Sequence, residues 1–162
     1  MKWVNHSACT FAGTYVLSSN LPLSFAVAAF SHLPDAIEYW PGNIIFRQHR
    51  GRSHSPALWI CLLLASIFLV YTPWMQQAEA IMGPWGFGFT ALWALVPALG
   101  GIFHLLEDSM SLSGIKMWKR KHPLALRLYK TGTRSEYFLV LGFVAACAFW
   151  EFLKWQVWQR FF

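Results

Sequence analysis

Three long apolar runs constrain this chain more than any other feature of its sequence. They cover residues 56–74, 84–106 and 137–153. Each is near the ~20 residues that an α-helix needs to cross ~30 Å of hydrocarbon. Pro97 and Gly100-Gly101 lie inside the second run and are expected to be kink points or close-packing points, because small residues let helix backbones approach. The runs predict three transmembrane helices.

The composition supports a lipid environment. Hydrophobic residues make up 56% of the 162 residues and charged residues only 12%, against about 25% charged residues in soluble domains. A soluble domain of this length could not bury so much apolar surface. The net charge of +6 is confined to a few loops. It therefore indicates membrane topology and anionic head groups, and no nucleic-acid partner is expected. The length favours a single domain over residues 1–162.

The N-terminal apolar stretch, residues 8–34, is interrupted by Ser18-Ser19-Asn20-Leu21-Pro22. It is either one long kinked span or a hairpin of two short helices that turns near Asn20. With a hairpin, the N-terminus and the 35–55 and 107–136 loops share one side. That side then carries every basic residue except Lys154 and Arg160. The positive-inside rule makes it cytoplasmic. The predicted fold is an all-α polytopic membrane helix bundle, an N-terminal helical hairpin plus three transmembrane helices.

Most histidines and acidic residues lie on the same basic side, where ionisable groups at helix ends are costly unless they have a use. His104 and Asp108 are spaced i, i+4 at the end of an apolar run, which places both on one helix face. They could bind one metal ion, or Asp108 could bridge two. A plain His–Asp hydrogen bond that caps the helix is the alternative.

The segment His49-Arg50-Gly51-Arg52-Ser53-His54 is the densest signal. A turn at Gly51 could bring His49 and His54 together. Arg50 would then suit phosphate, which guanidinium groups bind in a bidentate manner. A basic loop on anionic lipid is the alternative, and it explains the arginines but not the two histidines.

Three acidic residues are also candidates. Asp35 and Glu38 follow Pro34 and would share a face if a helix starts there, although Glu38 is better explained as an acid favoured by the helix dipole. Glu136 closes a Thr133-x-x-Glu136 pattern. This is typical of a capping box, and we weigh that role equally with a metal-ligand or supporting role.

Together these motifs resemble a known family, the inner-membrane-associated metal-dependent hydrolases, also described as LexA-binding. The matching residues run from His6 to Glu136: Leu33-Pro34-Asp35, the His49-to-Ser55 segment, His104-x-x-x-Asp108 and Thr131-Gly132-Thr133-x-x-Glu136. Two positions depart from the family pattern. Ile37 stands where a second Asp is usual, so either Glu38 substitutes for it or that carboxylate is absent. Ser53 replaces a Thr.

The ligand order is also distantly similar to that of the zinc-dependent phospholipase C and P1 nuclease group, which is all-helical. The resemblance implies that Asp35, His49 and His104 hold one metal ion. His6 would hold a second, with Asp108 bridging. It implies a divalent metal, one or two zinc ions, with manganese as the alternative. His6 and Asp35 can join one site only if the N-terminal segment is a hairpin.

The function implied is that of a membrane-bound metal-dependent hydrolase at the cytoplasmic face of the bacterial inner membrane. Its partners would be the bilayer and a phospholipid or lipid-linked phosphoester. Arg50 would neutralise phosphate oxygens. His54 would be a ligand, a proton shuttle or a residue that supports the ligands, and Glu136 would assist. A metal-ion or proton-coupled transporter and a non-enzymatic membrane-binding protein are the alternatives. The sequence does not predict an oligomeric state.

Overall fold

The computed structural model describes residues 1–39, 52–73, 77, 87–115 and 124–161. The part of the chain that it describes is all-helical, with isolated β-bridges pairing Ser111 with Tyr129 and Ile115 with Leu124. The helical elements are α1 (Trp3–Ser18), α2 (Leu21–Phe30), α3 (Leu33–Tyr39), the 3₁₀ turn η1 (Arg52–His54), α4 (Pro56–Val70), α6 (Phe87–Ser109) and α7 (Arg134–Phe161).

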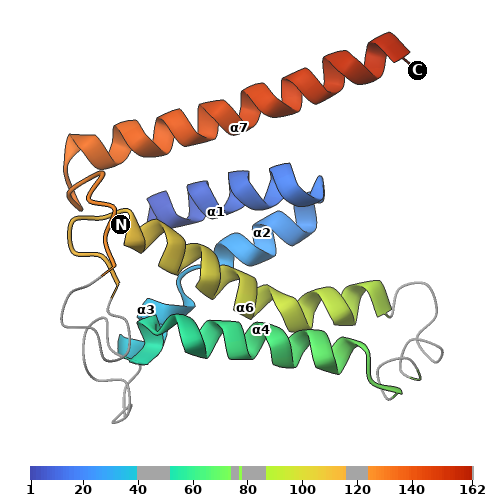
Figure 1. Cartoon of the computed structure of the whole chain (residues 1–162). Helices are drawn as coiled ribbons and strands as arrows, with labels where there is room; N and C mark the ends of the chain where they lie inside the picture. The colour runs from blue at the N-terminus through green and yellow to red at the C-terminus, as the bar shows by residue number, and fades with distance from the viewer. Residues whose placement is uncertain (40–51, 74–76, 78–86, 116–123, 162) are drawn as a thin grey trace.

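The N-terminal segment is a helical hairpin. α1 ends at Ser18, Ser19 adopts the left-handed conformation with φ 50°, and its N–H donates to Tyr15 O. Asn20 then caps α2, because its Oδ1 accepts the Leu23 N–H at 2.9 Å. α1 and α2 pack against each other along the hairpin (Figure 1). The predicted turn near Asn20 is confirmed, and the single-span alternative is wrong.

The helices stack in a simple order. α7 packs on α1, α1 on α2, α2 on α6 and α6 on α4 (Figure 1). α1 also contacts α6 directly, and α3 contacts both α6 and η1. This order brings the beginnings of α1 and α7 and the end of α6 to the same end of the molecule.

Gly100 and Gly101 allow two helices to approach α6. A Cβ on Gly100 would lie 2.6 Å from the Phe30 carbonyl carbon at the end of α2. One on Gly101 would lie 2.0 Å from Trp59 Cε3 on α4. Trp59 is buried, and its Nε1 donates to Ser53 O at 2.6 Å, which fixes η1 against α4. The close packing predicted for these glycines is confirmed.

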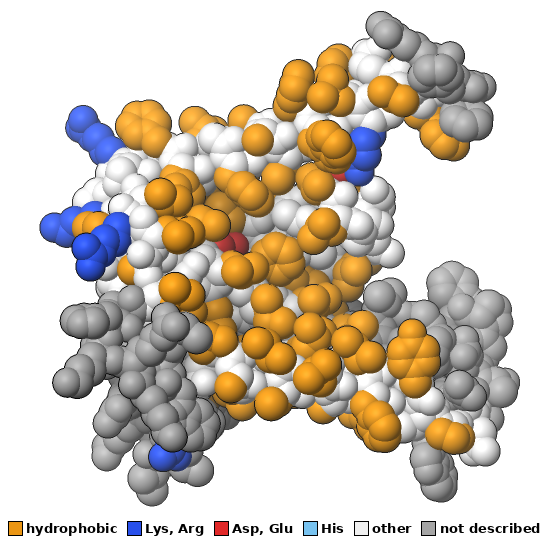
Figure 2. All heavy atoms as spheres, in the orientation of Figure 1, with side chains coloured by type: hydrophobic (Ala, Val, Ile, Leu, Met, Phe, Trp, Pro, Cys, Tyr) orange, Lys and Arg blue, Asp and Glu red, His pale blue; other side chains and the backbone are white. Residues whose placement is uncertain are grey.

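The outer faces of α4 and α7 are apolar and exposed. Leu64 and Phe68 on α4 are 60% and 73% exposed, and Phe138 and Leu141 on α7 are 72% and 67% exposed. Figure 2 shows hydrophobic side chains across much of the visible face. Contiguous exposed apolar surface of this kind marks a membrane or partner contact in a folded protein.

One helix in the described ranges is long and apolar enough to cross a membrane. It covers residues 134–159 of α7, and the apolar part of α4, Pro56–Leu69, is shorter. The run predicted over 137–153 lies inside α7, and the run over 84–106 corresponds to α6. The bundle of three transmembrane helices stays a prediction.

Candidate metal centre

Ionisable side chains from four elements meet at the end of the molecule where α1 begins. His6 comes from the first turns of α1 and Asp35 from the start of α3. His54 ends η1, and the neighbouring pair His104 and Asp108 ends α6. Their burial is unusual, since His6, His54, His104 and Asp108 are each no more than 2% exposed. Buried groups of this kind need partners or a metal ion.

The first group of potential ligands joins Asp35, His54 and His104. Nε2 of His54 lies 3.1 Å from Nε2 of His104 and 3.3 Å from Asp35 Oδ1. Asp35 Oδ1 lies 3.6 Å from His104 Nε2. Ligands about 2.0–2.1 Å from a tetrahedral zinc ion stand roughly 3.3–3.4 Å from one another. The three atoms are therefore spaced as ligands of one small metal ion.

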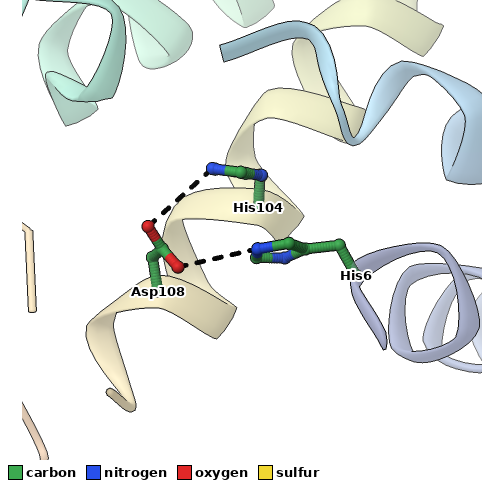
Figure 3. Close-up of side chains that lie close together, drawn as sticks. All are labelled: His6, His104 and Asp108. Carbon is green, nitrogen blue, oxygen red and sulfur yellow. Dashed lines mark ion pairs between the residues drawn. The ribbon is translucent and has the colours of Figure 1, made fainter. Parts of the chain in front are cut away.

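The second group joins His6, His104 and Asp108, drawn in Figure 3. Asp108 Oδ1 lies 3.6 Å from His6 Nε2, and Asp108 Oδ2 lies 3.9 Å from His104 Nε2. Oδ2 is also 3.8 Å from His54 Nε2. Asp108 thus presents one oxygen to His6 and the other to His54 and His104. This is the arrangement that a bridging carboxylate requires. The amino group of Met1 lies 3.0 Å from Oδ1.

Two further carboxylates support these histidines. Glu38 Oε1 lies 2.9 Å from His54 Nδ1, and Glu107 Oε2 contacts His6 Nδ1. In both pairs the carboxylate contacts Nδ1, and Nε2 of the histidine faces the site. Sequence reasoning missed Glu107 and assigned Glu38 to the helix dipole. The signal in the sequence is weak, because it consists only of the i, i+4 spacing that places His6 and Thr10 on one helix face. In the structure, Thr10 Oγ1 donates to Glu107 Oε1 at 2.9 Å.

Asp35 is held in an ionised state. Burial raises the pKa of its carboxyl group, but the hydrogen bond with His54, the charges of His104 and His54 and a hydrogen bond from Trp3 outweigh burial and lower the pKa to about 2. Trp3 Nε1 donates to Oδ2 at 3.2 Å. Oδ2 is therefore occupied, and Oδ1 is the oxygen left facing the histidines.

A cavity of about 220 Å³ opens onto these residues. Its lining consists of Met1, Trp3, His6, Asp35, Tyr39, Asp108 and Thr131. Trp3 and Tyr39 are 55% and 66% exposed, whereas His6 and Asp108 are buried. The cavity therefore leads from an aromatic rim to the potential ligand atoms.

The remaining predicted site residues fall into two cases. His49 and Arg50 lie outside the described residues. Glu136 is buried near the site, where it accepts hydrogen bonds from Lys2 N at 2.7 Å, Asn5 Nδ2 at 2.5 Å and Gly132 N at 2.6 Å. These bonds join the start of α1 to the start of α7.

The capping box predicted for Thr133 and Glu136 does not form. The Thr133 hydroxyl donates to Lys130 O, and the Glu136 N–H donates to the Thr133 carbonyl. The Glu136 carboxylate reaches Gly132 N and α1 in place of Thr133 N. The predicted catalytic role of Glu136 stays a prediction.

No protein-family model, curated protein or solved structure matches this chain. The ligand set itself indicates the chemistry of the site. Two or three imidazoles with one or two carboxylates, in a buried cluster, suit Zn²⁺ or a similar transition metal.

Proposed function

We propose that this chain is a membrane-bound metal-dependent hydrolase that cleaves a phosphoester carried by a lipid or a lipid-linked molecule. The observation that carries the proposal is the convergence of His54, His104 and Asp35 from three separate elements, with Asp108 beside them. Gathering these groups away from water is unfavourable unless cations balance the carboxylates, and the Met1 amino group pairs with one oxygen of Asp108 only.

The metal ions would be zinc, with manganese as the alternative. Asp35, His54 and His104 would hold the first, so His54 would be the ligand in place of His49, which the resemblance implies. His6 and Asp108 would hold the second, with Asp108 bridging. A divalent ion there would supply a water activated for attack at neutral pH. The described residues would position the ion, and the cavity that Trp3 and Tyr39 line would admit the phosphoester.

The membrane placement rests on two surfaces. Exposed basic residues lie at the site end, and Figure 2 shows Lys and Arg side chains gathered there. They include Lys2, Arg52, Arg127, Lys130 and Arg134. The apolar faces of α4 and α7 lie beside that end. We place α4, α6 and α7 across the inner membrane, with the site at the cytoplasmic face.

Exposed aromatic side chains support a site at head-group depth. Trp3, Tyr39 and Tyr137 are 55%, 66% and 46% exposed. Trp and Tyr favour the membrane–water interface. Trp3 and Tyr39 also line the cavity, so the potential ligands would lie at the level where a lipid carries its phosphoester.

The test is metal content and hydrolysis of the full chain in detergent. We expect one to two zinc or manganese ions per chain, and phosphate release from a phosphatidate in mixed micelles. Asp108→Asn and His54→Ala should lose both, and His32→Ala should keep both because His32 belongs to neither ligand group. If wild-type protein from zinc- and manganese-supplied cells holds no metal, or if the variants hydrolyse as wild type does, the proposal is wrong.

A transporter is the second candidate, and one observation favours it. Thr10 and Thr14 are buried on the same face of α1 as His6, at i, i+4 spacing. Thr14 Oγ1 has no hydrogen-bond partner in the described part of the chain. The buried polar side chains of His6, Thr10 and Thr14, which follow one face of α1, could carry protons or metal ions. Zinc uptake into proteoliposomes that Thr14→Val abolishes would support this candidate over the hydrolase.

A further inference from the structure

We propose that Glu38 and Glu107 are positioning residues that fix His54 and His6 and thereby build two metal positions with separate supports. The proposal rests on the proposed function, because it assumes that the site binds metal. It concerns two carboxylates outside both groups of potential ligands.

Glu38 holds His54 from one side. Its Oε1 lies 2.9 Å from His54 Nδ1 and accepts the Ser53 hydroxyl at 2.6 Å. The Glu38 side chain is only 3% exposed, so water does not compete strongly for this oxygen. A carboxylate that accepts from Nδ1–H leaves the lone pair on Nε2. That nitrogen faces His104 and Asp35.

Glu107 holds His6 in the same way. Its Oε2 contacts His6 Nδ1, while its Oε1 accepts the Thr10 hydroxyl at 2.9 Å. Glu107 is 6% exposed. His6 Nε2 then faces Asp108 Oδ1 at 3.6 Å. Each histidine therefore has a carboxylate on Nδ1, a hydroxyl that holds this carboxylate, and a potential metal ligand opposite Nε2.

The two supports come from different elements and act on different sides of Asp108. Glu38 belongs to α3 and serves the position with Asp35 Oδ1 and Asp108 Oδ2. Glu107 belongs to α6 and serves the position with Asp108 Oδ1. His104 differs from both histidines, because its Nδ1 has no hydrogen-bond partner among the described residues. Its ring stacks on His6 with centroids 4.1 Å apart.

Carboxylates that support metal-bound histidines typically contribute 10–100-fold to metal affinity. We expect Glu38→Ala to weaken zinc at the His54 position by roughly that factor, and Glu107→Ala to weaken zinc at the His6 position. Glu→Gln at either residue retains an acceptor oxygen and should recover most of the affinity. Glu151→Ala is the matched control, since Glu151 pairs with Lys154 on α7 at 2.5 Å, outside the site.

The experiment uses full-length protein in detergent. Zinc is titrated against a chromophoric chelator, and Co²⁺ replaces zinc so that its visible spectrum reports the geometry of each position. The two alanine variants should lose different binding steps and change different parts of the Co²⁺ spectrum. A merely structural role would lower thermal stability without this separation and without rescue by Gln.

Smaller changes keep the test decisive if an alanine variant does not fold. Ser53→Ala and Thr10→Val remove only the hydroxyls that hold Glu38 and Glu107, and each should weaken the corresponding step several-fold. Folded variants that bind zinc and Co²⁺ as wild type does would overturn this proposal alone. Wild-type protein without metal would overturn the proposed function as well.

Discussion

The site end of the molecule buries polar side chains, whereas the outer faces of α4 and α7 expose apolar ones. At the site end, His54 and His104 are fully buried. On the outer faces, Phe68 and Phe138 are more than 70% exposed. A soluble protein places these side chains the other way round. The contrast supports different surroundings for the two regions, the proposed metal ion at one and the proposed lipid at the other.

The two regions should therefore fail in different ways. Losing one group at the site end should remove a specific ligand or leave buried partners unsatisfied. Adding a charge to the outer faces should matter only if lipid surrounds them. The following changes separate these expectations.

His104→Ala should have the largest effect on the site. His104 belongs to both groups of potential ligands, so its loss leaves neither complete. We expect metal content to fall below a tenth of the wild-type value, measured by mass spectrometry of the metal after purification in detergent. His32→Ala is the control. Wild-type metal content in the His104 variant would contradict the assignment of the site.

Leu64→Arg tests the other side of the comparison. Leu64 is 60% exposed on α4. An arginine at the centre of a membrane helix costs about 2.5–3.5 kcal/mol, whereas an exposed position of a soluble protein accepts it at little cost. We expect the variant to lose accumulation in the membrane fraction. Leu128→Arg makes the same change at an exposed position of the basic end and should be tolerated. Equal behaviour of the two variants would argue against lipid around α4.

Gly101→Ala tests the packing that joins the two regions. The added Cβ would lie 2.0 Å from Trp59 Cε3, so Trp59 has to move, and its bond to Ser53 next to His54 is disturbed. We expect a loss of about 2 kcal/mol in unfolding free energy, as for overpacked cores. Thermal unfolding followed by circular dichroism in detergent measures it. Gly142→Ala, where no atom lies within 4 Å, should not destabilise the protein. Similar melting of both variants would show that the α4–α6 contact is looser than described.

Glu136→Gln should have the smallest effect. Both carboxylate oxygens of Glu136 accept hydrogen bonds. Glutamine would present its NH₂ group, which cannot accept, to one of these donors. We expect a loss of about 1 kcal/mol in stability with unchanged metal content. Ser135→Ala removes only exposed hydrogen bonds to Lys130 N and Thr133 Oγ1 and should cost less. Hydrolysis that disappears while stability is retained would instead support the catalytic role predicted for Glu136.

The sequence predicts those parts of the fold that depend on local signals. Asn20 followed by Leu21-Pro22 predicts a turn and a helix start, and Asn20 does cap α2. Ser55-Pro56 is also a typical helix start, and α4 begins at Pro56, although Ser55 makes no side-chain cap hydrogen bond. The i, i+4 spacing of His104 and Asp108 places both on one face of α6, where they meet in the site.

The partners of the site histidines could not be predicted in this way. Glu107 is adjacent to Asp108, and only the packing of α1 on α6 determines that Glu107 meets His6 Nδ1 while Asp108 meets Nε2. The choice of Glu38 as the partner of His54 depends on where η1 lies against α3. Such contacts depend on helix packing, which residue spacing alone does not specify.

The hydrogen bonds at the start of α1 have a consequence for the order of events during synthesis. Lys2 N and Asn5 pair with Glu136 across 134 and 131 residues, and His6 pairs with Glu107 across 101 residues. Because chains emerge from the ribosome N-terminus first, α1 exists long before these partners do. Its polar face cannot be satisfied within the protein until α6 and the first turn of α7 have been made. A nascent chain arrested before residue 134 should therefore hold α1 less firmly than the folded protein does. An early segment of this chain is thus among the last to reach its final environment.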